Sequence, residues 1–288
     1  MGRHFAPRAA ARVERISRRT MLAGGLSACA LTLLPRGEAW AAGAGEADTS
    51  PQSREEAIRS LPLNELTSET RRKLMAVIER PSIYRRLPQK QIDCDPALFV
   101  FLLRNPEVVV NIWELMGIAN MTAQRQGPYL WKGNDGSGTA CDVELVYGTD
   151  DLHVMYSDGF YEGPVLKNKL TGRCVLILKS GYGQNADRRW LVGNRLDVFV
   201  QIDNMGADMV ARTLAPWIGK QADNNFIESC KFATKLSQTA ETNGPGVQRL
   251  ADKLTKVEPS VREEFARLAI AVQQRAAQRD AGAAVQRR

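Results

Sequence analysis

Residues 117–203 constrain the fold most, because turn signals recur in this segment at short and regular intervals. Gly-Pro, Asn-Asp-Gly, Asp-Gly and Thr-Gly turns separate short runs rich in Val, Ile, Tyr, Phe, Leu and Trp. Such punctuation predicts short strands that form an antiparallel meander. The run 139–147 alternates between apolar and acidic residues, so four side chains are expected to share one face: Cys141, Val143, Leu145 and Tyr147.

Two strand runs of this segment alternate less clearly. They are 174–178 and 196–202, and both are apolar for most of their length. Strands of this composition are often covered on both faces of their sheet. We therefore expect part of the sheet to be sandwiched between other elements.

The residues before the meander carry two similar helix-start signals, Asp95-Pro96 and Asn105-Pro106. Asp and Asn can cap a helix, and Pro suits its first position. The signals predict helices over 96–104 and 106–116, which are apolar around much of their circumference and should be well buried. A short strand over 90–93 and a helix over 68–79 are expected upstream.

A helical pattern follows the meander from Met205 to about Ala240, with apolar residues at steps of three and four. Pro216 is expected to kink or split this helix, because proline removes one helical hydrogen bond. The run Asn243-Gly244-Pro245-Gly246 should end it. Two more helices are predicted over 247–257 and 259–279, and the last dozen residues are expected to fray.

The order of these elements, together with one particular stretch, resembles a known superfamily. The stretch runs from Ile92-Asp93-Cys94-Asp95-Pro96 through Leu103, followed by Asn105-Pro106 and Trp113. It is similar to the entry of the START-like superfamily, also called SRPBCC or polyketide cyclase-like, where a strand leads into two short helices. The resemblance covers about residues 86–240 and rests on element order. No catalytic residue carries over, because no motif matches.

The resemblance implies an α+β helix-grip fold, in which a curved antiparallel β-meander wraps a long C-terminal helix and encloses a cavity. Members of the superfamily bind lipids and other apolar molecules, and some are enzymes. With extra helices at both ends, five units are expected: a signal peptide at 1–41, a flexible linker at 42–60, an N-terminal helical extension at 61–85, the helix-grip domain at 86–243, and a C-terminal helical extension with a frayed tail at 244–288.

The N-terminus has the three zones of a targeting segment. An arginine-rich start precedes an uncharged stretch over 21–34, and the small-x-small triplet Ala39-Trp40-Ala41 suits signal peptidase. The pair Arg18-Arg19, between a serine and Thr-Met-Leu, matches the twin-arginine pattern that the Tat translocon recognises. An exported, periplasmic protein is therefore expected. Alternatives are an ordinary secretory signal, and a lipoprotein box that would anchor the chain through lipid on Cys29.

The signal also explains the basic charge of the chain. The full sequence carries a net charge of +7, but residues 1–41 hold seven arginines and two glutamates, so the remainder is close to neutral. Nucleic-acid binders usually concentrate basic charge in a patch, so nucleic acid is not an implied partner. The uncharged zone is too short to span a bilayer, and no later stretch is long and apolar enough.

Aromatic side chains are the best candidates for lining a cavity, since apolar ligand pockets are rich in them. The candidates are Trp113, Tyr147, Tyr156, Phe199 and Phe226. Ordinary core packing is the alternative for each of them.

Three further residues could carry chemistry. His153, the only histidine after the signal, could act as a general base. Its alternative is a strand histidine that faces solvent or makes one structural hydrogen bond. Cys141 and Cys174 start two runs of the meander and could form a disulfide if those strands are close.

Motifs for cofactors or metals are absent from the sequence. One histidine cannot form a histidine-rich metal site, and the cysteines show no zinc-ligand spacing. The runs Gly181–Ala186 and Asn134–Gly138 resemble a dinucleotide fingerprint and part of a calcium loop, but both fit hairpin turns better. No GxSxG or phosphate loop occurs.

The sequence leaves three functions open, in a definite order. An exported domain that binds an apolar small molecule or lipid comes first, with no cofactor. A structural or interaction protein, with a filled core and a partner surface on the terminal helices, comes second. An enzyme that uses His153 comes third.

Overall fold

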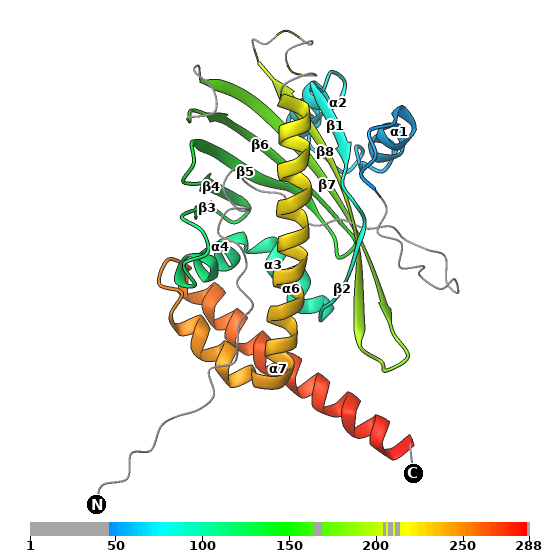
Figure 1. The fold of residues 1–288 in the computed structure, drawn as a ribbon, viewed down its shortest axis with the longest axis vertical. Coiled ribbons are helices and arrows are strands. Elements are labelled where there is room, and N and C mark those ends of the chain that lie inside the picture. Colours follow the sequence, from blue (N-terminus) through cyan, green and yellow to red (C-terminus); the bar gives the residue numbers. More distant parts are fainter. Residues whose placement is uncertain (1–45, 164–168, 204–205, 207–209, 211–213, 287–288) are drawn as a thin grey trace, which may run out of the picture.

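The protein, described by a computed structural model over residues 46–163, 169–203, 206, 210 and 214–286, folds around one antiparallel sheet (Figure 1). The sheet packs against long C-terminal helices, and extra helices precede it. The α+β class expected from the sequence is therefore confirmed.

Eight strands form the sheet within the described residues, in the order β1-β8-β7-β6-β5-β4-β3, with β2 also paired to β8. Strands β3 to β8 are each adjacent to the next strand in the chain, which is the predicted meander. The bounds are β1 Ile83–Arg86, β2 Lys90–Asp93, β3 Thr122–Gly127, β4 Leu130–Asn134, β5 Thr139–Gly148, β6 Leu152–Tyr161, β7 Leu170–Gln184 and β8 Trp190–Ile202.

The helices at 96–104 and 106–115 begin at their predicted start signals. Asp95 caps its helix by accepting hydrogen bonds from the backbone N–H groups of Ala97 and Leu98, at 3.0 and 3.2 Å. The longest helix, α6, changes direction at Asn243, whose backbone is not helical (φ −148°, ψ 58°). The bounds are α1 Pro51–Arg59, α2 Ser68–Ile78, α3 Pro96–Arg104, α4 Pro106–Leu115, α6 Ala215–Asp252 and α7 Pro259–Gln286.

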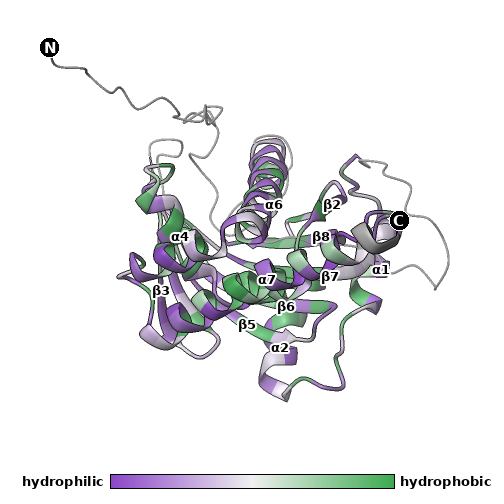
Figure 2. Ribbon diagram, turned by 90° about the horizontal axis from the view of Figure 1, so that it is seen from below, coloured by the Kyte–Doolittle hydropathy of each residue, from purple (hydrophilic) through white to green (hydrophobic). Residues whose placement is uncertain are grey.

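The sheet has helices on both faces, as Figure 2 shows for α6 on one side and α2 on the other. We call the face toward α3, α6 and α7 the inner face. Its core joins Phe99 and Phe101 of α3 to Phe226 of α6 and Phe265 of α7. We call the opposite face the outer face. There, a second core packs Leu74 and Val77 of α2 together with α1 against the sheet.

The prediction of a flexible linker over 42–60 is wrong for residues 51–59, which form α1. Ser50 caps this helix by accepting a hydrogen bond from the backbone N–H of Ser53 at 3.2 Å, and Pro51 occupies the first position. Ala57 is fully buried. The polar composition suggested disorder, but a local helix-start signal and docking on the sheet order the segment.

Two other boundaries differ from the expected ones. The sheet begins at Ile83, because β1 pairs with β8, so the segment 61–85 is not wholly helical. Helix α7 continues to Gln286, whereas the last dozen residues were expected to fray. Ala, Gln and Arg dominate this tail, and all three favour helix strongly.

Pro216 lies in the first turn of α6, where a missing N–H breaks no helical bond. The expected start of the helix near Met205 lies outside the described residues. Among the described helices, none combines the length and the apolar character that a membrane span requires.

Candidate functional site: an apolar cavity between sheet and helix

A cavity of about 220 Å³ lies between the inner face of the sheet and the first turns of α6. We call it the apolar cavity, since most of its lining is carbon. Its floor comes from β5 to β8 and its roof from α6. The lining residues are Thr139, Cys141, Ser157, Gly159, Phe160, Tyr161, Leu170, Thr171, Gly172, Arg173, Cys174, Leu176, Val198, Val200, Ile202, Leu214, Trp217, Ile218, Gln221, Ala222 and Asn225.

Small residues on adjacent strands create the floor. Cys141 pairs with Gly159, and Gly159 pairs with Gly172 in the next strand. Ser157 and Cys174 form the neighbouring pair. A Cβ on Gly159 would lie 2.5 Å from the Cβ of Cys141, so the backbones here approach too closely for a larger residue. Space therefore remains where larger side chains would normally fill the core.

The roof is one face of α6. Its lining residues recur at steps of one and of three to four residues, which places them along one side of the helix. They are Trp217, Ile218, Gln221, Ala222 and Asn225. Gln221 and Asn225 bring amide groups to this otherwise apolar roof.

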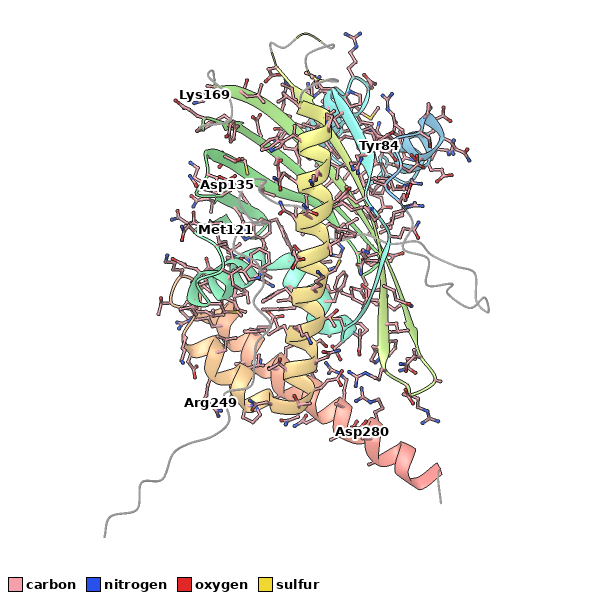
Figure 3. The ribbon with its side chains drawn as sticks, viewed as in Figure 1. Tyr84, Met121, Asp135, Lys169, Arg249 and Asp280 are labelled. Carbon is pink, nitrogen blue, oxygen red and sulfur yellow. The ribbon has the colours of Figure 1, made fainter. Side chains whose placement is uncertain are left out.

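An aromatic pair joins roof and floor. The ring of Trp217 meets that of Tyr161 edge-on, with centroids 6.2 Å apart. Charged groups lie at the edge of the cavity. Arg173 forms an ion pair with Asp203, and the ammonium of Lys169, labelled in Figure 3 near the start of β7, lies 3.6 Å from the ring centre of Phe160.

The two thiols in the floor are poor nucleophiles. Burial, reinforced by nearby Asp142 and Asp135, raises the pKa of Cys141 to about 11. Burial and the neighbouring Cys141 raise the pKa of Cys174 to about 12. Both are protonated at neutral pH, and only the thiolate attacks or binds metals well. Among the described residues, no group of three or more His, Cys, Asp or Glu side chains could hold a metal ion.

The disulfide considered possible between Cys141 and Cys174 is not formed, because both thiols are free. Strand β6 lies between β5 and β7, so the two residues are separated by two strand spacings of about 4.8 Å each. That separation exceeds the Cα distance of about 7 Å that a disulfide tolerates.

Three of the five aromatic candidates lie on the outer face and do not line the apolar cavity. Phe199 is fully buried in the core under α2, and Tyr147 and Tyr156 pack at its edge. Tyr147 donates a hydrogen bond to Glu65 at 2.9 Å. Alternation placed Tyr147 with Leu145, but the register shifts between these two residues, and such a bulge sends the following side chain to the other face.

The other two candidates lie on the inner side, also outside the lining of the cavity. Phe226 is fully buried, one turn beyond Ala222 on α6. Trp113 of α4 packs edge-on against Phe232 of α6, with ring centroids 5.4 Å apart. Several lining residues that the sequence reasoning missed are small, such as Ser157, Gly159 and Gly172, and their signal was a cluster of Gly, Ser and Cys at alternate strand positions.

His153 is fully buried on β6 and makes one hydrogen bond, with its Nε2 accepting from Nε of Arg104 at 3.3 Å. Burial, followed by the charge of Arg104, lowers the pKa of His153 to about 4. The imidazole is therefore neutral at physiological pH and a weak base. It is not among the residues that line the apolar cavity. This arrangement matches the structural alternative for His153.

The residues of the predicted signal, Arg18, Arg19, Ala39 and Ala41, and the alternative lipid site Cys29 all lie outside the described residues.

Comparison with known proteins found similarity in structure. No family model matches the chain, and no curated protein matches it. A solved structure similar to it is that of the di-domain ARO/CYC BexL from the BE-7585A biosynthetic pathway. The two share 12% sequence identity with a TM-score of 0.26. The match covers 64% of this chain and 55% of BexL, so this chain spans about half the length of that protein.

Proposed function

We propose that the protein binds a small apolar molecule in the apolar cavity. The cavity itself supports this proposal, because most of its lining is carbon and a few polar groups converge on it, as in small-molecule sites. A cavity of roughly 150 Å³ is enough for benzene. A volume of about 220 Å³ therefore suits a molecule of one or two rings, or a short acyl chain.

Indole, which is neutral and bicyclic, is a suitable probe. We expect the protein to bind indole in isothermal titration calorimetry, and Gln221→Trp to weaken binding at least tenfold, because Gln221 lines the cavity and the larger ring would fill it. Lys220→Trp is the matched control, since Lys220 is the exposed neighbour on the same helix. Equal binding by both variants would remove the support for this site.

Mass spectrometry of an organic extract of the purified protein should identify the natural ligand. A co-purifying apolar molecule that is lost in Gln221→Trp and retained in Lys220→Trp is the expected result. Ligand retained in both variants would place it elsewhere on the protein.

An interaction role is the second candidate, and exposed apolar side chains outside the terminal helices favour it. The exposed large apolar side chains among the described residues lie at the end of α4, on the β3–β4 hairpin and at the start of β8: Leu115, Met116, Tyr129, Leu130 and Trp190. The terminal helix α7 instead buries Phe265, Ala269 and Val272 in the inner core.

The targeting pattern at the N-terminus supports export through the Tat translocon. Replacing Arg18 and Arg19 together with lysine is expected to abolish export, because the receptor recognises the arginine pair. Cell fractionation with an antibody measures this. Export that continues in the double variant would indicate the ordinary secretory route. The mass of the exported chain then distinguishes cleavage after Ala41 from lipid attached to Cys29.

A further inference from the structure

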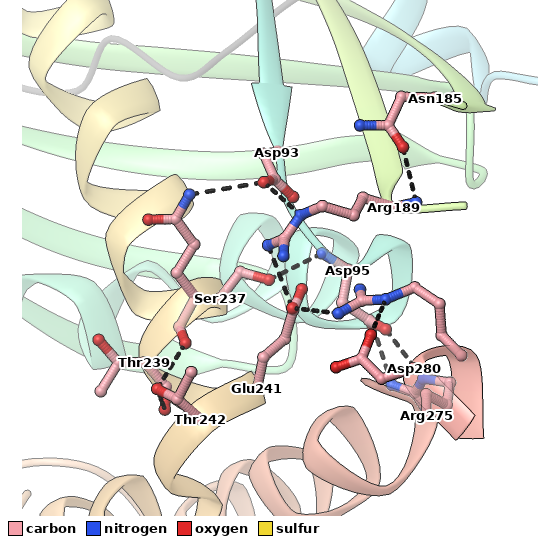
Figure 4. A network of polar contacts seen from close by, with 12 residues as sticks. Asp93, Asp95, Asn185, Arg189, Ser237, Thr239, Glu241, Thr242, Arg275 and Asp280 are labelled. Carbon is pink, nitrogen blue, oxygen red and sulfur yellow. Dashed lines mark hydrogen bonds and ion pairs between the residues drawn. The ribbon is translucent and has the colours of Figure 1, made fainter. Parts of the chain in front are cut away.

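A second and larger cavity, of about 460 Å³, lies where the β7–β8 hairpin meets α6, just before its kink at Asn243, and helix α7. We call it the arginine cleft. Figure 4 shows the polar network beside it, in which side chains from β2, the N-cap of α3, the β7–β8 turn, α6 and α7 meet. The lining residues are Asp95, Gln184, Arg188, Trp190, Glu241, Val272, Arg275, Ala276, Gln278 and Arg279.

The two carboxylates of the cleft are already bound by arginines. Arg275 donates to both oxygens of Asp95, at 2.8 and 2.9 Å, and this carboxylate also caps α3. Oε2 of Glu241 lies 3.1 Å from Nη2 of Arg189 and 3.1 Å from Nη2 of Arg279. Both carboxylates are nearly buried, so little acceptor capacity remains for a ligand.

The arginines, in contrast, keep donors free. A guanidinium carries five N–H donors and has no hydrogen-bond acceptor. Arg275 uses its Nε and Nη2 on Asp95 and is 42% exposed. Arg188 lines the cleft and is exposed, and its side chain has no hydrogen bond or ion pair with any described residue. The cleft therefore offers an excess of cationic donors, which suits an acceptor-rich ligand.

The backbone of Arg188 supports a role for its side chain. It is the non-glycine residue with positive φ among those described, at 57°, where the hairpin turns from Asn185 to Arg189. Glycine or asparagine adopts this conformation at lower cost. An arginine held in such a conformation, with its side chain at a cavity and without a partner among the described residues, points to a function for that side chain.

Trp190 supplies an apolar wall to the same cleft. Its side chain is 38% exposed, although a ring of this size is usually well covered. Arginine and an exposed aromatic face together suit a flat ligand that carries negative charge, because the ring can stack while the guanidinium binds the anion.

We propose that the arginine cleft binds a small organic anion, in which a carboxylate or phosphate group is attached to a flat apolar body. Arg188 and Arg275 bind the anionic group, and Trp190 packs on the flat part. This site is separate from the apolar cavity, and its lining shares no residue with it.

The test uses 2-naphthoate and its neutral counterpart 2-naphthamide, titrated by calorimetry into the full chain carrying Gln221→Trp, so that the apolar cavity is blocked. We expect 2-naphthoate to bind at least tenfold more tightly than the amide. Arg188→Gln should weaken naphthoate binding at least fivefold. Arg188→Gly should weaken it equally and raise the melting temperature by about 2–4 °C, because glycine relieves the positive φ.

Arg267→Gln is the matched control, because Arg267 is an exposed arginine elsewhere on α7. It should leave naphthoate binding unchanged. Equal binding of naphthoate and naphthamide, or equal effects of Arg188→Gln and Arg267→Gln, would overturn the proposal. Neither result would bear on indole binding in the apolar cavity, which is measured with Gln221 intact.

Discussion

Replacing Asp197 with alanine is expected to lower the free energy of unfolding by about 3–5 kcal/mol, the loss typical of a buried ion pair that loses one partner. Asp197 is fully buried on the outer face of β8. Its Oδ1 accepts hydrogen bonds from the hydroxyl of Tyr84 at 2.7 Å and from Nε of Arg86 at 2.8 Å. Nε of Arg195 lies 3.6 Å from its other oxygen.

The cost is high because two nearly buried guanidinium groups would share one remaining anion. Glu56 of α1 lies 2.9 Å from Arg86 and 4.0 Å from Arg195. Arg86 also donates to the backbone carbonyl of Ser53 at 2.8 Å, so the cluster holds α1 on the sheet. Loss of Asp197 is therefore expected to loosen α1 as well, which hydrogen exchange would detect as faster exchange over residues 51–59.

Urea unfolding at pH 7 measures the predicted loss. Tyr84→Phe removes one hydrogen bond and should cost about 1 kcal/mol. Asp187→Ala, on the exposed β7–β8 turn, is the surface control and should change stability by less than about 0.5 kcal/mol. A loss below about 1 kcal/mol for Asp197→Ala would show that the cluster contributes little to the stability of the fold.

The second large effect depends on pH. The pKa of His153 falls from an ordinary value of 6.5 to about 4 in the folded protein, because burial and then Arg104 disfavour the imidazolium. The unfolded chain therefore binds a proton near pH 6.5 that the folded chain binds only near pH 4. The stability that neutral His153 contributes is complete above pH 6.5 and is lost as the pH falls toward 4. By pH 4 the free energy of unfolding has fallen by about 3 kcal/mol for this reason.

His153→Gln isolates this contribution, because glutamine can still accept the hydrogen bond from Arg104 and does not titrate. Urea unfolding at pH 7, 6, 5 and 4 gives the stability of both proteins. The difference in the free energy of unfolding between wild type and variant should change by about 3 kcal/mol from pH 7 to pH 4, with the variant relatively more stable at low pH. A difference that stays constant with pH would mean that His153 titrates in the folded protein as it does in the unfolded chain.

The sequence predicted those features that depend on a few neighbouring residues. Asp95-Pro96 predicted the start of α3 correctly, because capping involves only the next backbone N–H groups. The run Asn134–Gly138 predicted a hairpin turn for the same reason, and the hairpin predicted at Gly181–Ala186 turns a few residues later, at Asn185–Arg189. The linker prediction was wrong for residues 51–59, because average composition does not reflect the local start signal Ser50-Pro51.

The candidate site was predicted less well than the fold. The choice of aromatic residues assumed that large rings mark a cavity, whereas Phe199 and Phe226 fill space and leave none. The cavity lies instead above Cys141, Gly159 and Gly172, three small residues that become neighbours only when β5, β6 and β7 pair. The arginine cleft likewise joins residues that are far apart in the chain, such as Asp95 and Arg275.

By itself, the sequence determined the order of the elements, the positions of caps and turns, and the antiparallel meander, because these follow from backbone preferences over a few residues. Only the tertiary structure decided which face each side chain occupies. One bulge after Leu145 moved Tyr147 to the outer face. Strand register, which long-range pairing determines, aligned Gly159 with Gly172 and so opened the apolar cavity under α6.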